Sequence, residues 1–142
     1  RAAQSITSIQ AAQLEKTFLP FRHNNDIVDY QAYSRADRKF HNFIADISKR
    51  EFLSSILQTF NIISLAYLYP TKGGLIRPPN ETIGEHIAII KAICRHDPKE
   101  AEQCMRFHLQ QSRTKLIKEI ESKKLHGKEV IDKRLCNQDT LQ

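Results

Sequence analysis

The sequence contains few of the residues that build turn-rich or cross-linked folds. Its 142 residues include four glycines, no tryptophan and three cysteines, Cys94, Cys104 and Cys136, without any CxxC spacing. So few glycines disfavour a β-fold with many tight turns. An odd number of unpaired cysteines indicates neither a disulfide framework nor a thiolate zinc site. We therefore expect a helical protein in a reducing cytoplasm.

Long apolar runs and a secretory signal are also missing. The longest apolar stretch, residues 62–69, is interrupted by Ser64 and is much shorter than the ~20 residues that span a membrane. The chain begins with Arg1 rather than methionine, and its first residues lack the apolar core of a signal peptide. We expect a piece of a longer protein that makes no membrane contact.

Basic residues exceed acidic ones, which gives a formal net charge of +6. They are dispersed, with local clusters only at residues 35–39 and 115–128, as is typical of solvated helix faces. A short helix-turn-helix with a basic recognition face cannot be placed without breaking the long helices described next. Direct DNA binding by this chain alone is therefore not expected.

Apolar residues recur with helical periodicity along most of the chain. Helices are predicted at residues 6–18, at 29–48 with Asp29 as N-cap, at 52–67 and from Thr82 to Asp97. A last helix is predicted from Pro98 toward Ile120, with Asp97 as its N-cap. The main loop is expected at residues 70–80, and Gly127 is expected to end any continuous helix. The fold class is thus all-α, an antiparallel bundle of about five to six helices. Residues 1–125 should form one domain, and residues 126–142 a polar tail or peripheral helix.

Asp37 and His41 are four residues apart on one predicted helix, so their side chains share a face. The apolar stripe of Phe40, Ile44 and Ile47 marks that face as the one that points to the core. A carboxylate that faces inward needs a partner.

His86 and His108 also lie on apolar stripes. His86 lies eleven residues before Asp97 and His108 eleven residues after it, so a hairpin that turns at Asp97 places both imidazoles at the same height. With Asp37 and His41 they provide three nitrogens and one oxygen, which suit zinc, nickel, cobalt, manganese or iron. The alternative is a set of core histidines that are hydrogen-bonded to neighbours without a metal. No role is assigned to the three other histidines, which fall at turns or helix ends: His23, His96 and His126.

These residues form a pattern that resembles the C-terminal effector-binding domain (FCD) of FadR-type regulators in the GntR family, over roughly residues 5–122. The motifs are Asp29-x3-Tyr33-x3-Asp37-x2-Phe40-His41, then Glu85-His86-x2-Ile89-x2-Ala92-Ile93-x3-Asp97, then Ala101-Glu102-x2-Met105-Arg106-x-His108-Leu109. Two features depart from the family. Its first helix and N-terminal winged helix-turn-helix are expected to be absent here, and Ser48-Lys49-Arg50 stands where it commonly has Ser-Gly-Asn.

The resemblance implies a homodimeric transcription regulator that binds a small organic acid in the bundle core, often through a divalent metal. DNA would be bound only through the separate winged-helix domain. In the metal-containing branch, four ligands correspond to Asp37, His41, His86 and His108, with zinc as the expected ion.

Three functions compete on this basis. The first is a non-enzymatic sensor, in which the effector site draws on residues near the open side of the metal, namely Arg38, Asn61, Thr82 and Arg106. The second is a metallohydrolase with Glu85 as base, which the roughly 100° between Glu85 and His86 around the helix disfavours. Glu85 is expected instead to pair at the surface or to support a histidine. The third is a metal-free interaction bundle. We favour the sensor, and do not expect an enzyme.

Overall fold

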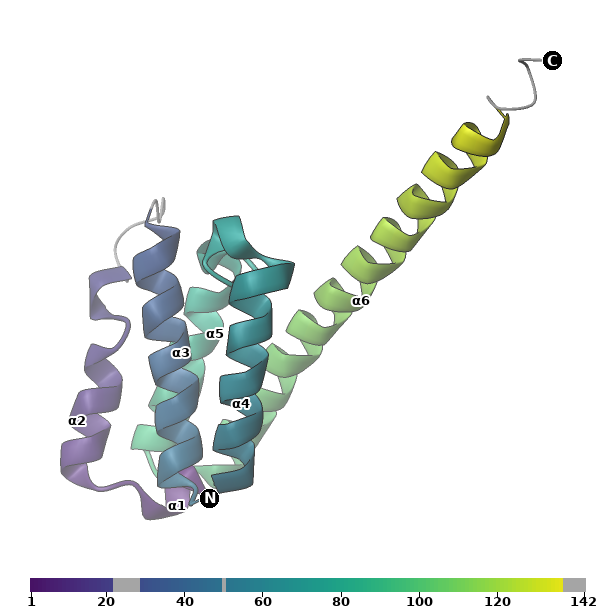
Figure 1. The fold of residues 1–142 in the computed structure, drawn as a ribbon. Coiled ribbons are helices and arrows are strands. Elements are labelled where there is room, and N and C mark those ends of the chain that lie inside the picture. The colour runs from purple at the N-terminus through teal and green to yellow at the C-terminus, as the bar shows by residue number, and fades with distance from the viewer. Residues whose placement is uncertain (22–28, 50, 137–142) are drawn as a thin grey trace.

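A computed structural model describes residues 1–21, 29–49 and 51–136, and within these ranges it contains helices and turns only (Figure 1). The all-α fold predicted from the sequence is confirmed. The helices are α1 (Ala2–Ser5), α2 (Ser8–Lys16), α3 (Tyr30–Ile47), α4 (Glu51–Ile63), α5 (Pro79–Cys94) and α6 (Pro98–Cys136). Short 3₁₀-helical segments lie at Leu19–Phe21 and Pro70–Lys72, and a π-helical segment lies at Ser64–Leu68.

Side-chain caps explain where the helices begin. The carboxylate of Asp29 accepts a hydrogen bond from the backbone of Ala32 at the start of α3, and Asp97 does the same for Glu100 at the start of α6. Both predicted N-caps are confirmed, and each satisfies a backbone N–H that has no partner within its helix. The helix α5 begins at Pro79 rather than at Thr82, because proline is well suited to a first helical position.

Two predictions about helix ends can be compared with the structure. The helix α6 continues through Gly127 to Cys136, so the expectation that Gly127 would end it was wrong. A glycine inside a helix costs about 1 kcal/mol relative to alanine, which weakens the helix without terminating it. After α3, Lys49 adopts a φ of 52° at the position where the related family commonly has glycine. This left-handed conformation is the usual reason for a glycine there.

The core forms where α2, α3 and α5 meet. Phe18 is fully buried, and its ring centroid lies 5.5 Å from those of Tyr33 and Phe40. The imidazole of His86 stacks on the same Phe18 ring at 4.7 Å. An ionisable side chain therefore lies inside the aromatic core rather than at its edge.

The helices α4 and α6 are less enclosed. No residue of α4 is buried, and Phe52 on its surface is 80% exposed. Figure 1 shows that the C-terminal part of α6 leaves the bundle. None of the described helices is both long and apolar enough to cross a membrane.

Replacing Gly73 by alanine should destabilise the fold by about 1–2 kcal/mol. Gly73 has a φ of 61°, and a Cβ there would lie 3.0 Å from the Cβ of Ser34. Gly84→Ala is the matched control, because nothing outside its own helix backbone lies within 4 Å of the position that a methyl group would take there. That change should stabilise the protein by about 0.5–1 kcal/mol. Urea denaturation of both variants tests the pair, and equal effects would contradict the backbone argument.

Candidate metal centre

The first member of the centre is His86 on α5, whose side chain is completely buried. Its Nδ1 shares a hydrogen bond of 3.0 Å with the hydroxyl of Tyr33, which in turn lies 2.9 Å from the hydroxyl of Thr82. Among the described residues, Nε2 of His86 has no hydrogen-bond partner, although it lies 3.3 Å from Oδ1 of Asp37. A buried nitrogen without a partner is costly, so this atom requires an explanation.

The second member is His108 on α6, which is 4% exposed. Its ring centroid lies 4.6 Å from that of His86, which confirms that the hairpin brings the two imidazoles to the same height. Its Nδ1 lies 2.8 Å from Oε2 of Glu85. A carboxylate at this distance favours the tautomer with the proton on Nδ1, which leaves the Nε2 lone pair available.

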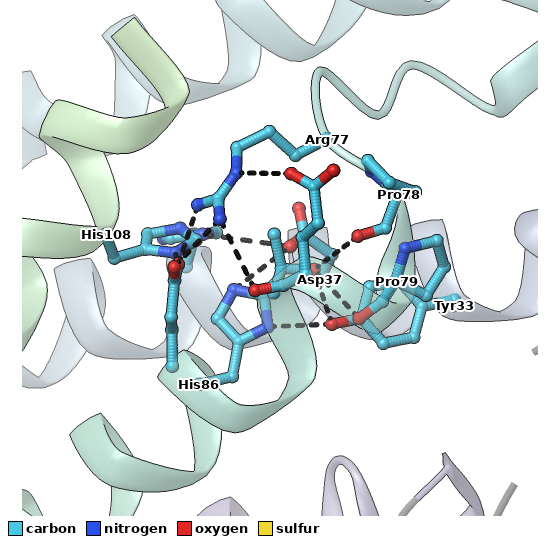
Figure 2. A network of polar contacts seen from close by, with 11 residues as sticks. Tyr33, Asp37, Arg77, Pro78, Pro79, His86 and His108 are labelled. Atoms are coloured by element: carbon cyan, nitrogen blue, oxygen red, sulfur yellow. Dashed lines mark hydrogen bonds and ion pairs between the residues drawn. The ribbon is translucent and has the colours of Figure 1, made fainter. Parts of the chain in front are cut away.

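His41 and Asp37 on α3 complete the group. The His41 ring centroid lies 5.3 Å from that of His108 and 5.6 Å from that of His86. One nitrogen from each histidine can be chosen so that all three lie within 4.8 Å of one another. Asp37 lies beside them, with its Oδ1 3.9 Å from Nε2 of His41. Three helices thus bring all four expected ligands together, in what we call the histidine centre. Figure 2 labels three of them, Asp37, His86 and His108.

The charge state of the histidine centre follows from its burial. Burial lowers the pKa of His41 to about 4 and that of His86 much further below its ordinary value. It also lowers the pKa of His108. All three imidazoles are therefore neutral near pH 7, which is the form that ligates metals. Burial raises the pKa of Asp37 to about 6, and His108 and Arg38 only partly oppose this effect.

A divalent cation fits this donor set. Three neutral nitrogens and one carboxylate oxygen form a common ligand combination for zinc and other first-row metals. An ion there would use the unpartnered Nε2 of His86 and would add positive charge beside Asp37, whose pKa is raised.

A cavity of about 130 Å³ lies against the histidine centre, between α4, α6 and the segment before α5. By volume it is comparable to a cavity that holds benzene. Asp37, His41 and His108 contribute to its wall. The other residues that line it are Ser34, Arg38, Leu57, Phe60, Asn61, Ser64, Gly74, Leu75, Ile76, Arg77, Thr82, Leu109 and Ser112.

Three of the four expected effector residues, Arg38, Asn61 and Thr82, line this cavity. Arg106 does not line this cavity, and its place in the effector site stays a prediction. Its side chain is 67% exposed and pairs with Glu102 one turn earlier on α6. Because residue 106 is two positions before His108, it lies about 200° around the helix from that ligand.

The other histidines stay outside the centre wherever they are described. His96 is exposed, and its Nδ1 lies 3.0 Å from the backbone oxygen of Ala3. His23 and the side chain of His126 lie outside the described residues.

Sequence reasoning missed Arg77, which the structure places in the wall of the cavity with 9% of its surface exposed. Its guanidinium makes two hydrogen bonds of 2.8 Å to Glu85 and one of 3.2 Å to Glu81. The sequence does place Arg77, Glu81 and Glu85 four residues apart, as in ion pairs along one helix face. Arg77 precedes the first residue of α5, however, so helical periodicity did not assign it a partner.

The sequence predicted that Glu85 would either pair at the surface or support a histidine. The structure shows the second, because Glu85 contacts His108. Burial by itself would raise the pKa of Glu85, but the hydrogen bonds from Arg77 and His108 outweigh it, so that the pKa is lowered. A carboxylate that is engaged in this way is a poor general base, which weighs against a hydrolase.

Comparison with known proteins agrees with this geometry. The FCD domain family matches residues 1–111, and the chain belongs to that family. FCD domains are the effector-sensing domains of GntR-type transcription regulators, so the class predicted by resemblance is confirmed.

Particular relatives are HTH-type transcriptional repressors named NanR. The protein from Escherichia coli K12 is 33% identical over 110 residues, and that from Edwardsiella tarda is 28% identical over 113 residues. Each match covers 76% of this chain, which spans 41% of the length of the relatives. No solved structure matches the chain.

Lowering the pH from 7 to 5 in the presence of a chelator should reduce the free energy of unfolding by roughly 2–4 kcal/mol. The three histidines of the centre have lowered pKa values when folded, whereas in the unfolded chain they take up protons near pH 6.5. Protonation of the unfolded state therefore removes stability as the pH falls below about 6.5. Asp37 has a raised pKa in the folded state, so its protonation increases the free energy of unfolding as the pH falls. This single group opposes three histidines, so the net effect remains a loss of stability.

Urea denaturation at several pH values measures this dependence. His96→Asn is the control and should keep it, because His96 lies outside the histidine centre. His41→Asn should weaken it. A free energy of unfolding that stays constant from pH 7 to 5 would show that these histidines are not buried in neutral form.

Proposed function

We propose that this chain is the ligand-sensing domain of a transcription regulator and binds one divalent metal through Asp37, His41, His86 and His108. The observation that carries the proposal is the buried, unpartnered Nε2 of His86 beside two further neutral imidazoles and a carboxylate. Zinc is the expected ion, and nickel, manganese, cobalt and iron are alternatives with compatible ligand preferences.

A small carboxylate is the proposed effector. The cavity opens directly on the histidine centre, and Arg38 brings a positive charge to its wall. The Nη1 of this arginine donates hydrogen bonds to the hydroxyl of Ser34 and the carbonyl of Gly73, which hold the guanidinium in place. A bound ion would supply further positive charge and open coordination positions for an acidic oxygen. Asn61 and Thr82 add polar groups to the same wall.

Sensing rather than catalysis is supported by the relatives, which are named as transcriptional repressors. DNA contact is assigned to a separate winged-helix domain, because no described part of this chain resembles one and the relatives are longer. The runner-up functions remain a metallohydrolase and a metal-free interaction bundle. The cytoplasmic location stays a prediction.

A homodimer is supported by the unburied apolar residues of two helices. On α4 they include Phe52, Ile56 and Phe60, and on α6 they include Leu109 and Ile117. Large apolar side chains that stay exposed on a folded chain favour burial against another protein surface.

Replacing His86 or His108 by alanine should abolish stoichiometric metal, because each change removes one of four ligands. Elemental analysis of protein purified without chelator measures the ratio of metal to chain. His96→Asn is the control and should retain the wild-type ratio. In the wild type, a chelator at pH 7.5 should also lower the melting temperature, since metal bound only by the folded state stabilises it. Unchanged metal content in both alanine variants would reject the ligand assignment.

A small di- or tricarboxylic or sugar acid should raise the melting temperature of the metal-loaded protein without being consumed. Arg38→Met should weaken the apparent affinity about tenfold, since a charged hydrogen bond contributes about 1.5–3 kcal/mol. Arg106→Met is the matched control and should bind as the wild type does, because Arg106 faces away from the cavity. A thermal-shift titration with product analysis measures both effects. Stabilisation that persists in His108→Ala would argue against coordination, and turnover of the acid would favour an enzyme.

A further inference from the structure

The ion pair between Arg77 and Glu85 lies in the interior, next to the histidine centre. The side chains of Arg77 and Glu85 are 8% and 14% exposed. Their two parallel hydrogen bonds join both guanidinium Nη atoms to both carboxylate oxygens. A buried pair of this kind contributes little net stability compared with apolar side chains, because both charges lose their hydration. Its position therefore matters more than its strength.

Glu85 links this pair to a member of the histidine centre. Its Oε2 accepts hydrogen bonds of 2.8 Å from both Nη1 of Arg77 and Nδ1 of His108. Any displacement of the carboxylate therefore affects two partners at once. We call this chain of three side chains the Arg77–Glu85–His108 relay. Figure 2 shows the side chain of Arg77 extending toward His108.

Arg77, at the end of the relay opposite His108, lies in the cavity wall. Arg77 belongs to the segment 74–77, all four residues of which line the cavity. The other end of this segment is held by a hydrogen bond from the hydroxyl of Ser64 to the carbonyl of Gly74. Within the segment, the amides of Gly74 and Leu75 donate to the carbonyls of Tyr69 and Lys72. Arg77 is thus a polar anchor between the cavity wall and the helices α5 and α6.

We propose that Arg77 and Glu85 are positioning residues that couple metal occupancy at His108 to the position of the cavity wall formed by residues 74–77. This inference rests on the proposed metal site. A metal that binds Nε2 of His108 fixes the ring, the ring orients Glu85 through Nδ1, and Glu85 holds Arg77 through two bonds. Coupling of this kind is reciprocal, so a ligand that orders the wall also strengthens metal binding.

Hydrogen exchange at the amides of Gly74 and Leu75, with zinc as the probe, tests the relay. In the wild type, zinc should slow exchange at these amides about fivefold or more relative to chelated protein. Arg77→Gln should still bind stoichiometric zinc, because Glu85 keeps its contact with His108, but zinc should no longer slow this exchange. Glu85→Gln should lose the same effect and should also bind zinc about 10–100-fold more weakly. Glu81→Gln is the matched control, since Glu81 contacts Arg77 but is not part of the relay.

Each outcome separates the relay from the metal site. Circular dichroism and the zinc content of every variant show whether it is folded and loaded. Wild-type protein without stoichiometric zinc would overturn the proposed function. Zinc-loaded wild type and Arg77→Gln with equal zinc-dependent protection would overturn the relay alone. Loss of protection in Glu81→Gln as well would also overturn it, because the effect would then come from Arg77 burial rather than from its link to His108.

Discussion

The structure depends on one constraint, which is that two buried imidazoles, a half-buried imidazole and a half-buried carboxylate meet between α3, α5 and α6. Leaving such groups in a protein core without partners costs free energy. The hydroxyl of Tyr33 and the carboxylate of Glu85 provide partners for the Nδ1 atoms of His86 and His108. These contacts leave the remaining nitrogens facing one another. The register of the α5–α6 hairpin and the rotation of α3 must therefore both be maintained for the core to be satisfied.

The two sides of the histidine centre differ in how they are supported. His86 stacks on Phe18 in the aromatic core, where close packing leaves little room for movement. His108 is supported instead by charged side chains that connect to a loop. The cavity lies on this second side. His86 is thus positioned by close packing, and His108 by polar contacts that reach the cavity wall.

The charges of the site support the proposed binding of a metal ion and, beside it, of an acid. Neutral histidines and a carboxylate with a raised pKa leave the histidine centre without a positive charge of its own. A divalent ion bound there would make the adjoining cavity attractive to acids, and Arg38 in the cavity wall acts in the same direction. Arg77 does not add to this attraction, because its nitrogens are already bonded to Glu81 and Glu85.

The sequence by itself determined the longer helices, the N-caps Asp29 and Asp97, and the equal spacing of His86 and His108 about the hairpin turn, because periodicity, capping and spacing are local properties. It did not predict the short helix α1. It also indicated that Asp37 and His41 share an inward face. Only the tertiary structure decided that Arg77 reaches Glu85 and that Arg106 points away from the cavity. It also decided that α6 continues through Gly127. Arg77 lies in a loop, where no periodicity assigns a side chain its partner. Which side of α6 faces the cavity depends on the helices that pack against it.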